Sequence, residues 1–439
     1  MAVRDAIQTI PLSKTTKFIV DNRGRTAPAI ESGIPLIATN CITNQRLYPA
    51  FENLRYVSQE TYDTWFRSHP LPGDIILTNK GSQNGAICLV PDPVGFVIAQ
   101  DMVALRADES VIDPLFLFAV LRSSDVQREI KNLDVSGVIP HFKKTDFDKL
   151  HLPYPDRQVQ EAIGRIYFDF CAKIELNRRM NATLEAMARA LFQSWFVDFD
   201  PVRAKLDGRK PEGMDKATAA LFPDAFQESP IGPVPKGWKV GMISDLATLN
   251  RGAVNPGDFP TETFDHFSLP SFDNGRTPKV ELGSAIMSNK FTVLPNSVLL
   301  SKLNPHIPRI WLPDLNALRR SVCSTEFMVV CSKLGFSREY LFSLFTSSAF
   351  ASIYGTLVTG TTGSHQRIRP ESVLEMKIVI PPPPLIQAFT DIAKPIFDRI
   401  NHNTEQSRTL ATLRDTLLPK LLSGELSVAH STITKGDKL

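Results

Sequence analysis

Cysteine is scarce in this sequence of 439 residues, and none of its five cysteines forms a Cys-x-x-Cys pair. An odd number of unpaired cysteines argues against a disulfide framework and against a zinc knuckle. The sequence also lacks an apolar run of about 18 residues, the length that crosses a membrane. Arg4 and Asp5 stand where a signal peptide needs an apolar run. These absences predict a cytoplasmic protein without a membrane segment.

Charge of one sign is not in large excess either. The chain carries 49 basic and 46 acidic residues, which gives a formal net charge of +3. Residues 1–157 contain 17 basic and 18 acidic residues, and residues 236–383 contain 15 and 11. A charge this small does not indicate a nucleic-acid partner for the chain as a whole. Any site for a polyanion therefore has to be a local patch.

The sequence motifs of common enzymes are missing as well. No GxxxxGK[ST] loop, HExxH pair or GxSxG turn occurs, which excludes the usual phosphate loop, zinc protease site and nucleophile elbow. A DNA amino-methyltransferase needs an Asn/Asp-Pro-Pro-aromatic loop, and neither Asn255-Pro256-Gly257 nor Asn304-Pro305-His306 fits it. Glu375-Met376-Lys377 has the spacing of a nuclease motif, but strand-edge solvation explains it better. We therefore expect no catalytic residue and no metal site in the chain itself.

What the sequence does contain is an internal repeat at a constant numbering offset of 226. The turn Ser136-Gly137 corresponds to Thr362-Gly363, and the register continues without a gap into the long segments that follow. Identical residues in the two copies include Ala162 and Ala388, Ile174 and Ile400, Asn177 and Asn403, and Leu191 and Leu417. Further upstream, Leu71-Pro72 resembles Leu294-Pro295 at an offset of 223. One structural unit therefore occurs twice.

Each copy has a variable front and a helical back. The first front contains β-rich apolar runs separated by turn signals such as Lys80-Gly81 and Asn84-Gly85, which predict a mixed α/β domain. The predicted fold class is α+β, with two similar mixed domains and two long helices. In chain order we expect a first domain at 1–157, a long helix at 158–199, a linker at 200–235, a second domain at 236–383, a long helix at 384–424 and a flexible tail at 425–439.

Both helical backs carry apolar residues at spacings of three and four, which is typical of a helix packed along another helix. Each is about 40 residues long, whereas the usual helix has about 11 or 12. A surface helix lying on its own domain is the alternative. Pro395 and Pro419 predict a kink or a break in the second helix. The expected helix–helix seam consists of Ile166, Ile174, Asn177, Leu184, Leu191, Ile392, Ile400, Asn403, Leu410 and Leu417.

These features together resemble the specificity (S) subunit of type I restriction-modification enzymes. The resemblance rests on the duplicated unit, on the Gly-containing loop, strand and proline-ended entry to a long helix in each copy, and on a specific stretch, Leu191-Phe192-Gln193-Ser194-Trp195-Phe196-Val197-Asp198-Phe199-Asp200-Pro201-Val202. The later Pro235-Lys236-Gly237-Trp238 belongs with it. The second domain departs from the pattern by a more irregular opening at residues 255–273.

The resemblance implies two target-recognition domains separated by two antiparallel helices that form a coiled-coil spacer with pseudo-two-fold symmetry. Each domain would read one half of a split, asymmetric sequence in double-stranded DNA. The body would bind two modification (methyltransferase) subunits and, through them, restriction (translocase/endonuclease) subunits. S-adenosylmethionine, ATP and Mg would be held by those partners only, and the chain would carry no cofactor.

Loops rich in polar and basic residues are the candidates for DNA contact, because Arg and Lys bind guanine edges or phosphates and Asn and Gln bind adenine. A solvated surface loop explains each single residue equally well. In the first domain the candidates are Lys80, Ser82, Gln83, Asn84, His141, Lys143 and Lys144. In the second they are Lys302, Asn304, His306, Arg309, His365, Gln366, Arg367 and Arg369.

Two other classes of function remain open on the sequence. A self-sufficient DNA methyltransferase or nuclease with unfamiliar motifs would transfer methyl groups or cut DNA without partners. A scaffold with twin protein-binding domains would leave DNA unprotected even when modification subunits are present.

Overall fold

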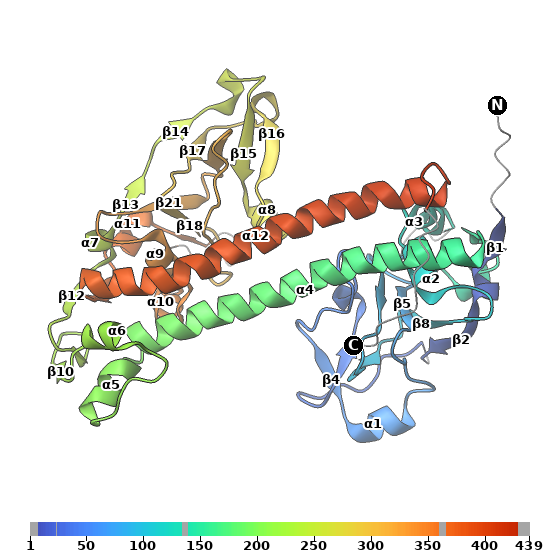
Figure 1. The fold of residues 1–439 in the computed structure, drawn as a ribbon, viewed down its shortest axis with the longest axis horizontal. Helices are drawn as coiled ribbons and strands as arrows, with labels where there is room; N and C mark the ends of the chain where they lie inside the picture. Colours follow the sequence, from blue (N-terminus) through green and yellow to red (C-terminus); the bar gives the residue numbers. More distant parts are fainter. Residues whose placement is uncertain (1–7, 23, 134–138, 360–365, 429–439) are drawn as a thin grey trace. The chain divides into compact units, whose positions relative to one another are not determined.

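The structure is a computed structural model, and it describes residues 8–22, 24–133, 139–359 and 366–428. The chain forms two compact units (Figure 1). Unit 1 comprises Met1–Arg179 and Asn403–Leu439, and unit 2 comprises Met180–His402. Across the described ranges, no helix is both long enough and apolar enough to cross a membrane.

A four-stranded antiparallel sheet forms the centre of each domain, with the same strand order in both. In unit 1 the order is β2-β8-β5-β6, with β2 at Thr16–Asp21, β5 at Ile75–Thr78, β6 at Ile87–Leu89 and β8 at Met102–Ala107. In unit 2 the order is β13-β21-β18-β19, with β13 at Ala247–Asn250, β18 at Ser297–Ser301, β19 at Ile310–Trp311 and β21 at Phe327–Ser332. The repeat therefore extends into the fronts, where the sequences had diverged.

A second sheet in each domain is built around one parallel strand pair. In unit 1 the order is β4-β3-β7, with β3 at Ile34–Ile37, β4 at Arg55–Val57 and β7 at Val97–Ile98. In unit 2 the order is β14-β17-β20-β15-β16, with β14 at Ala253–Val254, β15 at Thr263–Phe267, β16 at Lys279–Leu282, β17 at Lys290–Thr292 and β20 at Arg320–Cys323. The pairs β3/β7 and β15/β20 are both parallel. The second domain thus has two additional strands, β14 before and β17 after its irregular stretch at residues 255–273.

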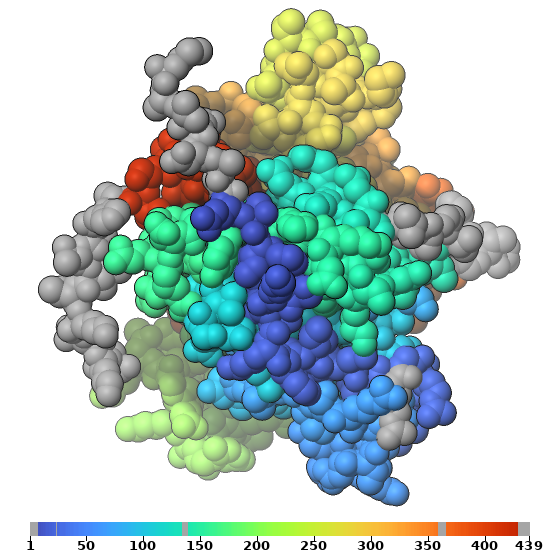
Figure 2. All heavy atoms as spheres, turned by 90° about the vertical axis from the view of Figure 1, so that its right-hand side faces the viewer, coloured from blue at the N-terminus to red at the C-terminus, as the bar shows by residue number. Residues whose placement is uncertain are grey.

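Two short helices follow the central sheet in each domain. They are α2 at Pro114–Leu121 and α3 at Ser124–Asn132 in unit 1, and α9 at Arg338–Thr346 and α10 at Ser348–Tyr354 in unit 2. A strand pair then closes each domain: β1 at Thr9–Pro11 with β9 at His151–Pro153, and β12 at Lys239–Met242 with β24 at Lys377–Ile380. In Figure 2 the blue and cyan segments of the first domain, distant in sequence, lie against one another.

The remaining elements are short. They are η1 at Leu12–Thr15, η2 at Thr39–Cys41, α1 at Gln59–Thr64, η3 at Lys144–Asp146, α5 at Asp200–Leu206, α6 at Lys216–Ala220, β10 at Phe226–Gln227, β11 at Val234–Pro235, α7 at Ile243–Leu246, η4 at Pro256–Asp258, α8 at Leu269–Asp273, η5 at Gly283–Ala285, β22 at Val358–Thr359, β23 at Arg367–Ile368 and α11 at Pro370–Leu374.

Two helices of 40 residues pass from one unit into the other: α4 at Arg157–Phe196 and α12 at Pro383–Leu422. Within unit 1, Asn177 on α4 donates from Nδ2 to the carbonyl oxygen of Asn403 (3.3 Å) and to Gln406 Oε1 (2.8 Å) on α12. Within unit 2, Asn181 donates to the carbonyl oxygen of Ile400 (3.3 Å). Because later residues of α4 meet earlier residues of α12, the helices run antiparallel. The predicted fold class is confirmed.

The buried positions of the two long helices repeat at the same numbering offset as the sequence. The buried pairs include Ile163 and Phe389, Tyr167 and Ala393, Cys171 and Phe397, Asn177 and Asn403, Ala188 and Arg414, and Phe192 and Leu418. The expected seam included Ile392, which is wrong, because its side chain is 43% exposed while its neighbour Ala393 is fully buried. Most of the other expected aliphatic seam residues, such as Ile166 and Leu184, are half-buried.

Neither proline interrupts α12. The helix continues through Pro395 and Pro419 to Leu422, so the predicted break is wrong. Pro395 is exposed, on the face away from the buried residues Ala393 and Phe397. A missing backbone hydrogen bond on the solvent-facing side of a helix lowers stability less than one on the buried side. Water and a slight bend of the helix can satisfy the freed carbonyl there.

The core of unit 2 includes an aromatic cluster from the Leu191–Val202 stretch. Phe192, Trp195, Phe196 and Phe199 are all buried there, and Phe196 contacts Trp238 with ring centroids 6.0 Å apart. This packing explains why that stretch and the later Trp occur together in the sequence. The segment after α4 is therefore part of the domain core over its first residues.

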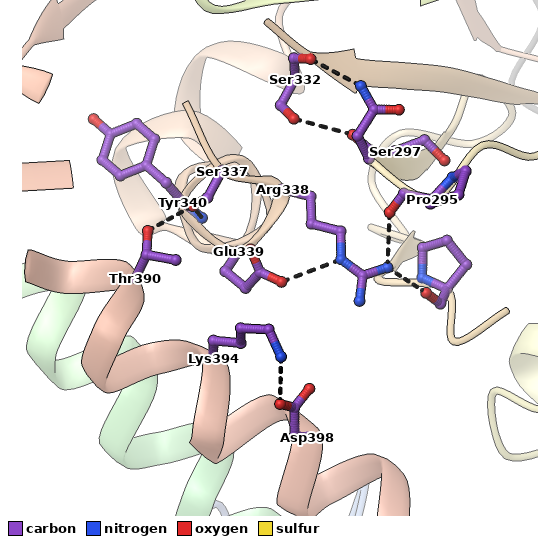
Figure 3. A network of polar contacts seen from close by, with 12 residues as sticks. Pro295, Ser297, Ser332, Ser337, Arg338, Glu339, Tyr340, Thr390, Lys394 and Asp398 are labelled. Carbon is purple, nitrogen blue, oxygen red and sulfur yellow. Dashed lines mark hydrogen bonds and ion pairs between the residues drawn. The ribbon is translucent and has the colours of Figure 1, made fainter. Parts of the chain in front are cut away.

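A polar network fastens α9 to its surroundings within unit 2 (Figure 3). Arg338 donates from Nη1 to the carbonyl oxygens of Pro295 (3.1 Å) and Pro313 (2.8 Å). The hydroxyl groups of Ser337 and Thr390 lie 2.7 Å apart and join the start of α9 to α12. The second domain is thus attached to its long helix by hydrogen bonds as well as by apolar packing.

Candidate nucleic-acid interface

In unit 1 the structure brings together two candidate loops that lie far apart in the sequence. Lys80, which follows β5, forms an isolated antiparallel bridge with His141. Gly81 donates its backbone N–H to Pro140 (2.9 Å), and Phe142 donates to Asn79 (2.9 Å). We call residues 79–85 and 140–144 the first paired loops.

In unit 2 the equivalent loops meet in the same way. Leu303, just after β18, forms an isolated antiparallel bridge with Arg367. Asn304 donates its backbone N–H to Gln366 (2.9 Å), and Ile368 donates to Lys302 (3.1 Å). We call residues 302–309 and 366–369 the second paired loops.

The two bridges occupy equivalent positions of the repeat. Lys80 and Leu303 are related by the numbering offset of the upstream region, and His141 and Arg367 are related by the offset of the long helices. The duplicated fold therefore constructs the same composite surface twice, and nearly all the candidate DNA-binding residues lie on it. His365 lies outside the described residues.

The side chains of the first paired loops have different roles. Ser82, Gln83 and Lys143 are exposed, and His141 is half-buried. Asn84 accepts the backbone N–H of Phe142 through Oδ1 (3.2 Å), so its amide group helps to hold the two loops together.

Two of the first-domain cations already have carboxylate partners. Lys144 forms an ion pair with Asp21, and Lys80 lies 4.0 Å from a carboxylate oxygen of Asp101. Both contacts are partly exposed, where an ion pair contributes about 0 to 1 kcal/mol and exchanges readily.

The second paired loops contain two bidentate ion pairs. Arg367 binds both carboxylate oxygens of Glu326 (3.1 and 2.8 Å). Arg309 binds both oxygens of Asp273 (2.7 and 2.8 Å), and this hydrogen bonding raises the pKa of the Arg309 guanidinium above its ordinary value. A fork-shaped contact of this kind fixes the plane of each guanidinium.

The other second-domain candidates are more loosely held. His306 and Arg369 are exposed, and Gln366 is half-buried. Lys302 lies over the ring of Phe291, 5.8 Å from its centroid. Asn304 has a left-handed φ of 51°, a conformation that asparagine adopts more readily than most residues. The turn alone is therefore sufficient to explain why an asparagine occurs at this position.

One exposed cation occupies the same place in both copies. Lys143 immediately precedes η3, and Arg369, its equivalent in the repeat, immediately precedes α11. Within the described part of the chain, neither side chain has a carboxylate within ion-pair distance. These two residues are therefore the best placed to bind a phosphate.

The carboxylates that pair with the candidate cations could not be found from the sequence. Asp21 lies 123 residues from Lys144, and Glu326 lies 41 residues from Arg367. Only the order of the strands brings them together, and no motif marks that order.

The described residues contain no group of three or more His, Cys, Asp or Glu side chains that could hold a metal ion. The five cysteines are buried and unpaired. Burial raises the pKa of the Cys323 thiol to about 12, which keeps it in the inert thiol form at neutral pH.

Comparison with known proteins shows which family the chain resembles. Residues 27–186 match the family model for the type I restriction modification DNA specificity domain. The chain is 25% identical over 403 residues to the type I restriction enzyme HindI specificity subunit of Haemophilus influenzae, covering 81% of this chain and 86% of the relative. The chain is thus similar to type I specificity subunits. The type I restriction enzyme MjaIX specificity subunit of Methanocaldococcus jannaschii is also 25% identical, over 376 residues, with 81% and 78% covered.

A solved structure of a specificity subunit has the same fold. The crystal structure of the type I restriction-modification S subunit from M. genitalium superimposes with a TM-score of 0.56, covering 96% of this chain and 98% of that one, at 13% sequence identity. The resemblance to specificity subunits inferred from the sequence is confirmed. The expectation of a specificity subunit in place of a catalytic one agrees with the names of both relatives.

Proposed function

We propose that this chain is the DNA sequence-specificity subunit of a type I restriction-modification complex. The observation that carries the proposal is the repeated composite surface: the same two loops, joined by the same isolated bridge, occur in both units. A protein that reads a sequence in two halves needs two such surfaces. The kinship with specificity subunits supports the same conclusion.

We assign reading of one half-site to residues 1–157 and of the other to residues 236–383. The polar groups suited to base edges are Gln83 and His141 in the first domain, and Gln366, Arg367 and His306 in the second, because amide and guanidinium groups match the donor and acceptor pattern of the major groove. Arg367 would exchange its carboxylate partner Glu326 for a base or a phosphate on binding. Lys143 and Arg369 would position the domains on the backbone.

The paired helices would set the distance between the half-sites and dock two modification subunits. We assign this role to residues 158–199 and 384–424, with 200–235 as the connection between the copies and 425–439 as a tail without a direct role. Restriction subunits would join through the modification subunits. S-adenosylmethionine, ATP and Mg would be supplied with those partners.

The first experiment tests the phosphate contacts. The double substitution Lys143→Ala, Arg369→Ala should weaken DNA binding to a similar degree on every sequence and reduce the slope of log affinity against log salt by about 2, since each phosphate contact contributes about 0.9. Lys216→Ala, which removes an exposed lysine from α6, is the matched control and should change nothing. An unchanged slope in the double variant would show that these cations do not meet DNA.

The small net charge of the chain leads to a second test. If the modification subunits supply much of the electrostatic affinity, the complex should show a steeper salt dependence of DNA binding than the isolated chain does. Equal slopes would mean that the partners add no phosphate contacts.

A further inference from the structure

A small buried cavity lies in unit 1 where α2, α4 and α12 meet. Its volume is about 20 Å³, and its lining includes the side chains of Arg122, Cys171, Glu175, Arg178 and Arg414. A space of this size holds one water molecule or one small ion, since about 10 to 15 Å³ is needed for a water. Three of these lining side chains are guanidinium groups, which makes the cavity cationic.

Arg122 lines this cavity with a buried and largely unpaired guanidinium group. Its side chain is 8% exposed, and it follows the last turn of α2. Its Nε and Nη2 atoms are buried and have no hydrogen-bond partner among the described residues. Its Nη1 atom makes a weak contact with Cys171 Sγ at 3.9 Å. A buried guanidinium with two unsatisfied donors is costly unless something accepts from them.

A second buried arginine approaches the same point from α12. Arg414, also 8% exposed, lies 3.8 Å from Cys171 Sγ through its own Nη1. The guanidinium groups of Arg122 and Arg414 both lie against the ring of Tyr167, 5.9 and 5.8 Å from its centroid. The two cations therefore flank one sulfur atom and one aromatic ring, where their mutual repulsion is poorly screened.

The charges around the cavity leave one cation uncompensated. Arg414 binds both carboxylate oxygens of its neighbour Asp415 (2.8 and 3.1 Å). Glu175 accepts hydrogen bonds from Arg178 and from Arg179, so its carboxylate already has two cationic partners. Arg122 has no carboxylate within ion-pair distance in the described ranges, which leaves one positive charge to be balanced.

The equivalent place in unit 2 has lost both cations. Arg414 corresponds to Ala188 and Cys171 to Phe397 at the offset of 226. Arg122 corresponds to Thr346, because each immediately precedes the serine that caps the second short helix, Ser123 in unit 1 and Ser347 in unit 2. Ala188, Phe397 and Thr346 all line a larger cavity of about 200 Å³ with an aromatic wall. Arg189 and Arg276 also line that cavity, but they stand at other positions of the repeat, and Arg276 pairs with Glu185 (3.0 Å). The arrangement of Arg122 and Arg414 around Cys171 therefore has no counterpart at the same positions of unit 2.

We propose that the unit 1 cavity binds one small monovalent anion of halide size between Arg122 and Arg414. The anion accepts hydrogen bonds from Nε and Nη2 of Arg122 and balances its charge. Because Arg122 lies at the end of α2 while Arg414 and Cys171 belong to the long helices, the bound ion ties the first domain to the helix pair within unit 1.

The test compares the thermal unfolding of the full-length chain in sodium chloride or bromide with that in sodium gluconate at equal ionic strength. The wild type should unfold about 2 to 4 °C higher in the halide salts at concentrations well above the dissociation constant. Arg122→Met keeps the length of the side chain and removes the charge, and it should abolish the difference. Arg128→Met, at an exposed arginine of α3, is the control and should retain it.

A structure of the wild-type chain crystallised in bromide gives an answer that does not depend on whether the variant folds. We expect an anomalous peak in the cavity within about 3.5 Å of Arg122 Nη2. A wild type whose unfolding is the same in all three salts, a halide effect that persists in Arg122→Met, or a cavity that holds only water would each overturn the proposal.

Discussion

At the residue scale, Asn177 shows how a single polar group fixes the register of the helix pair. Its side chain is 1% exposed and donates to Asn403, Gln406 and Ser407 on α12. Asn177→Ala should lower the free energy of unfolding by about 1 to 3 kcal/mol, because it removes the hydrogen bonds that this buried amide donates across the helix pair. Asn181→Ala, at a half-buried site one turn away, should cost less. Equal losses measured by denaturant titration would contradict the role given to Asn177.

A second residue-scale prediction concerns His266 on β15. Its Nδ1 lies 2.7 Å from Glu281 Oε2, and burial lowers the pKa of the imidazole below its ordinary value of 6.5 although Glu281 opposes the shift. The unfolded chain therefore binds this proton more readily than the folded one. The stability that His266 contributes is present above about pH 6.5 and is lost as the pH falls through the folded pKa. An NMR titration should give a pKa below 6.5, and a higher value would refute this.

At the element scale, Gly164 allows α4 to approach the start of α2. A Cβ atom at this position would lie 2.5 Å from the backbone nitrogen of Phe116 and 2.8 Å from a carboxylate oxygen of Asp113. Gly164→Ala should therefore destabilise the chain by about 1 to 3 kcal/mol, although helix propensity alone would stabilise it by about 1 kcal/mol. Gly355→Ala, where the nearest atom lies at 3.6 Å, is the control. A gain in stability at Gly164 would disprove the close approach.

The elements also show what the sequence could and could not predict. The heptad spacing predicted both long helices and their mutual packing. It selected Ile392 for the seam in place of Ala393, because a pattern of hydrophobicity favours the larger residue. The buried positions at Ala188, Cys171 and Ala393 carry small side chains, and the packing of each long helix against its partner and its domain sets them. Which of two adjacent positions faces the partner is decided by that packing and not by the residue's own hydrophobicity.

At the scale of the whole molecule, the sequence predicted the repeat in the helical backs and in part of the fronts, at Leu71-Pro72 and Leu294-Pro295, whereas the structure extends it through the sheets of both fronts. The central sheets share one strand order although their sequences differ. The candidate loops were predicted by composition alone. Their meeting in pairs, and the carboxylates that neutralise Arg309 and Arg367, depend on strand pairings between distant residues that composition does not encode.

A chimaera in which a second copy of the first domain replaces the second domain tests most directly whether each domain reads its own half-site. Residues 239–380 are replaced by residues 9–154, so that both closing strand pairs and both helix starts keep their repeat positions. The chimaera is assembled with its modification subunits, and the modified bases are mapped across random DNA. We predict a symmetric target made of two inverted copies of the half-site read by the first domain, with the wild-type gap. Modification of the unchanged wild-type target would contradict the assignment of reading to the two domains.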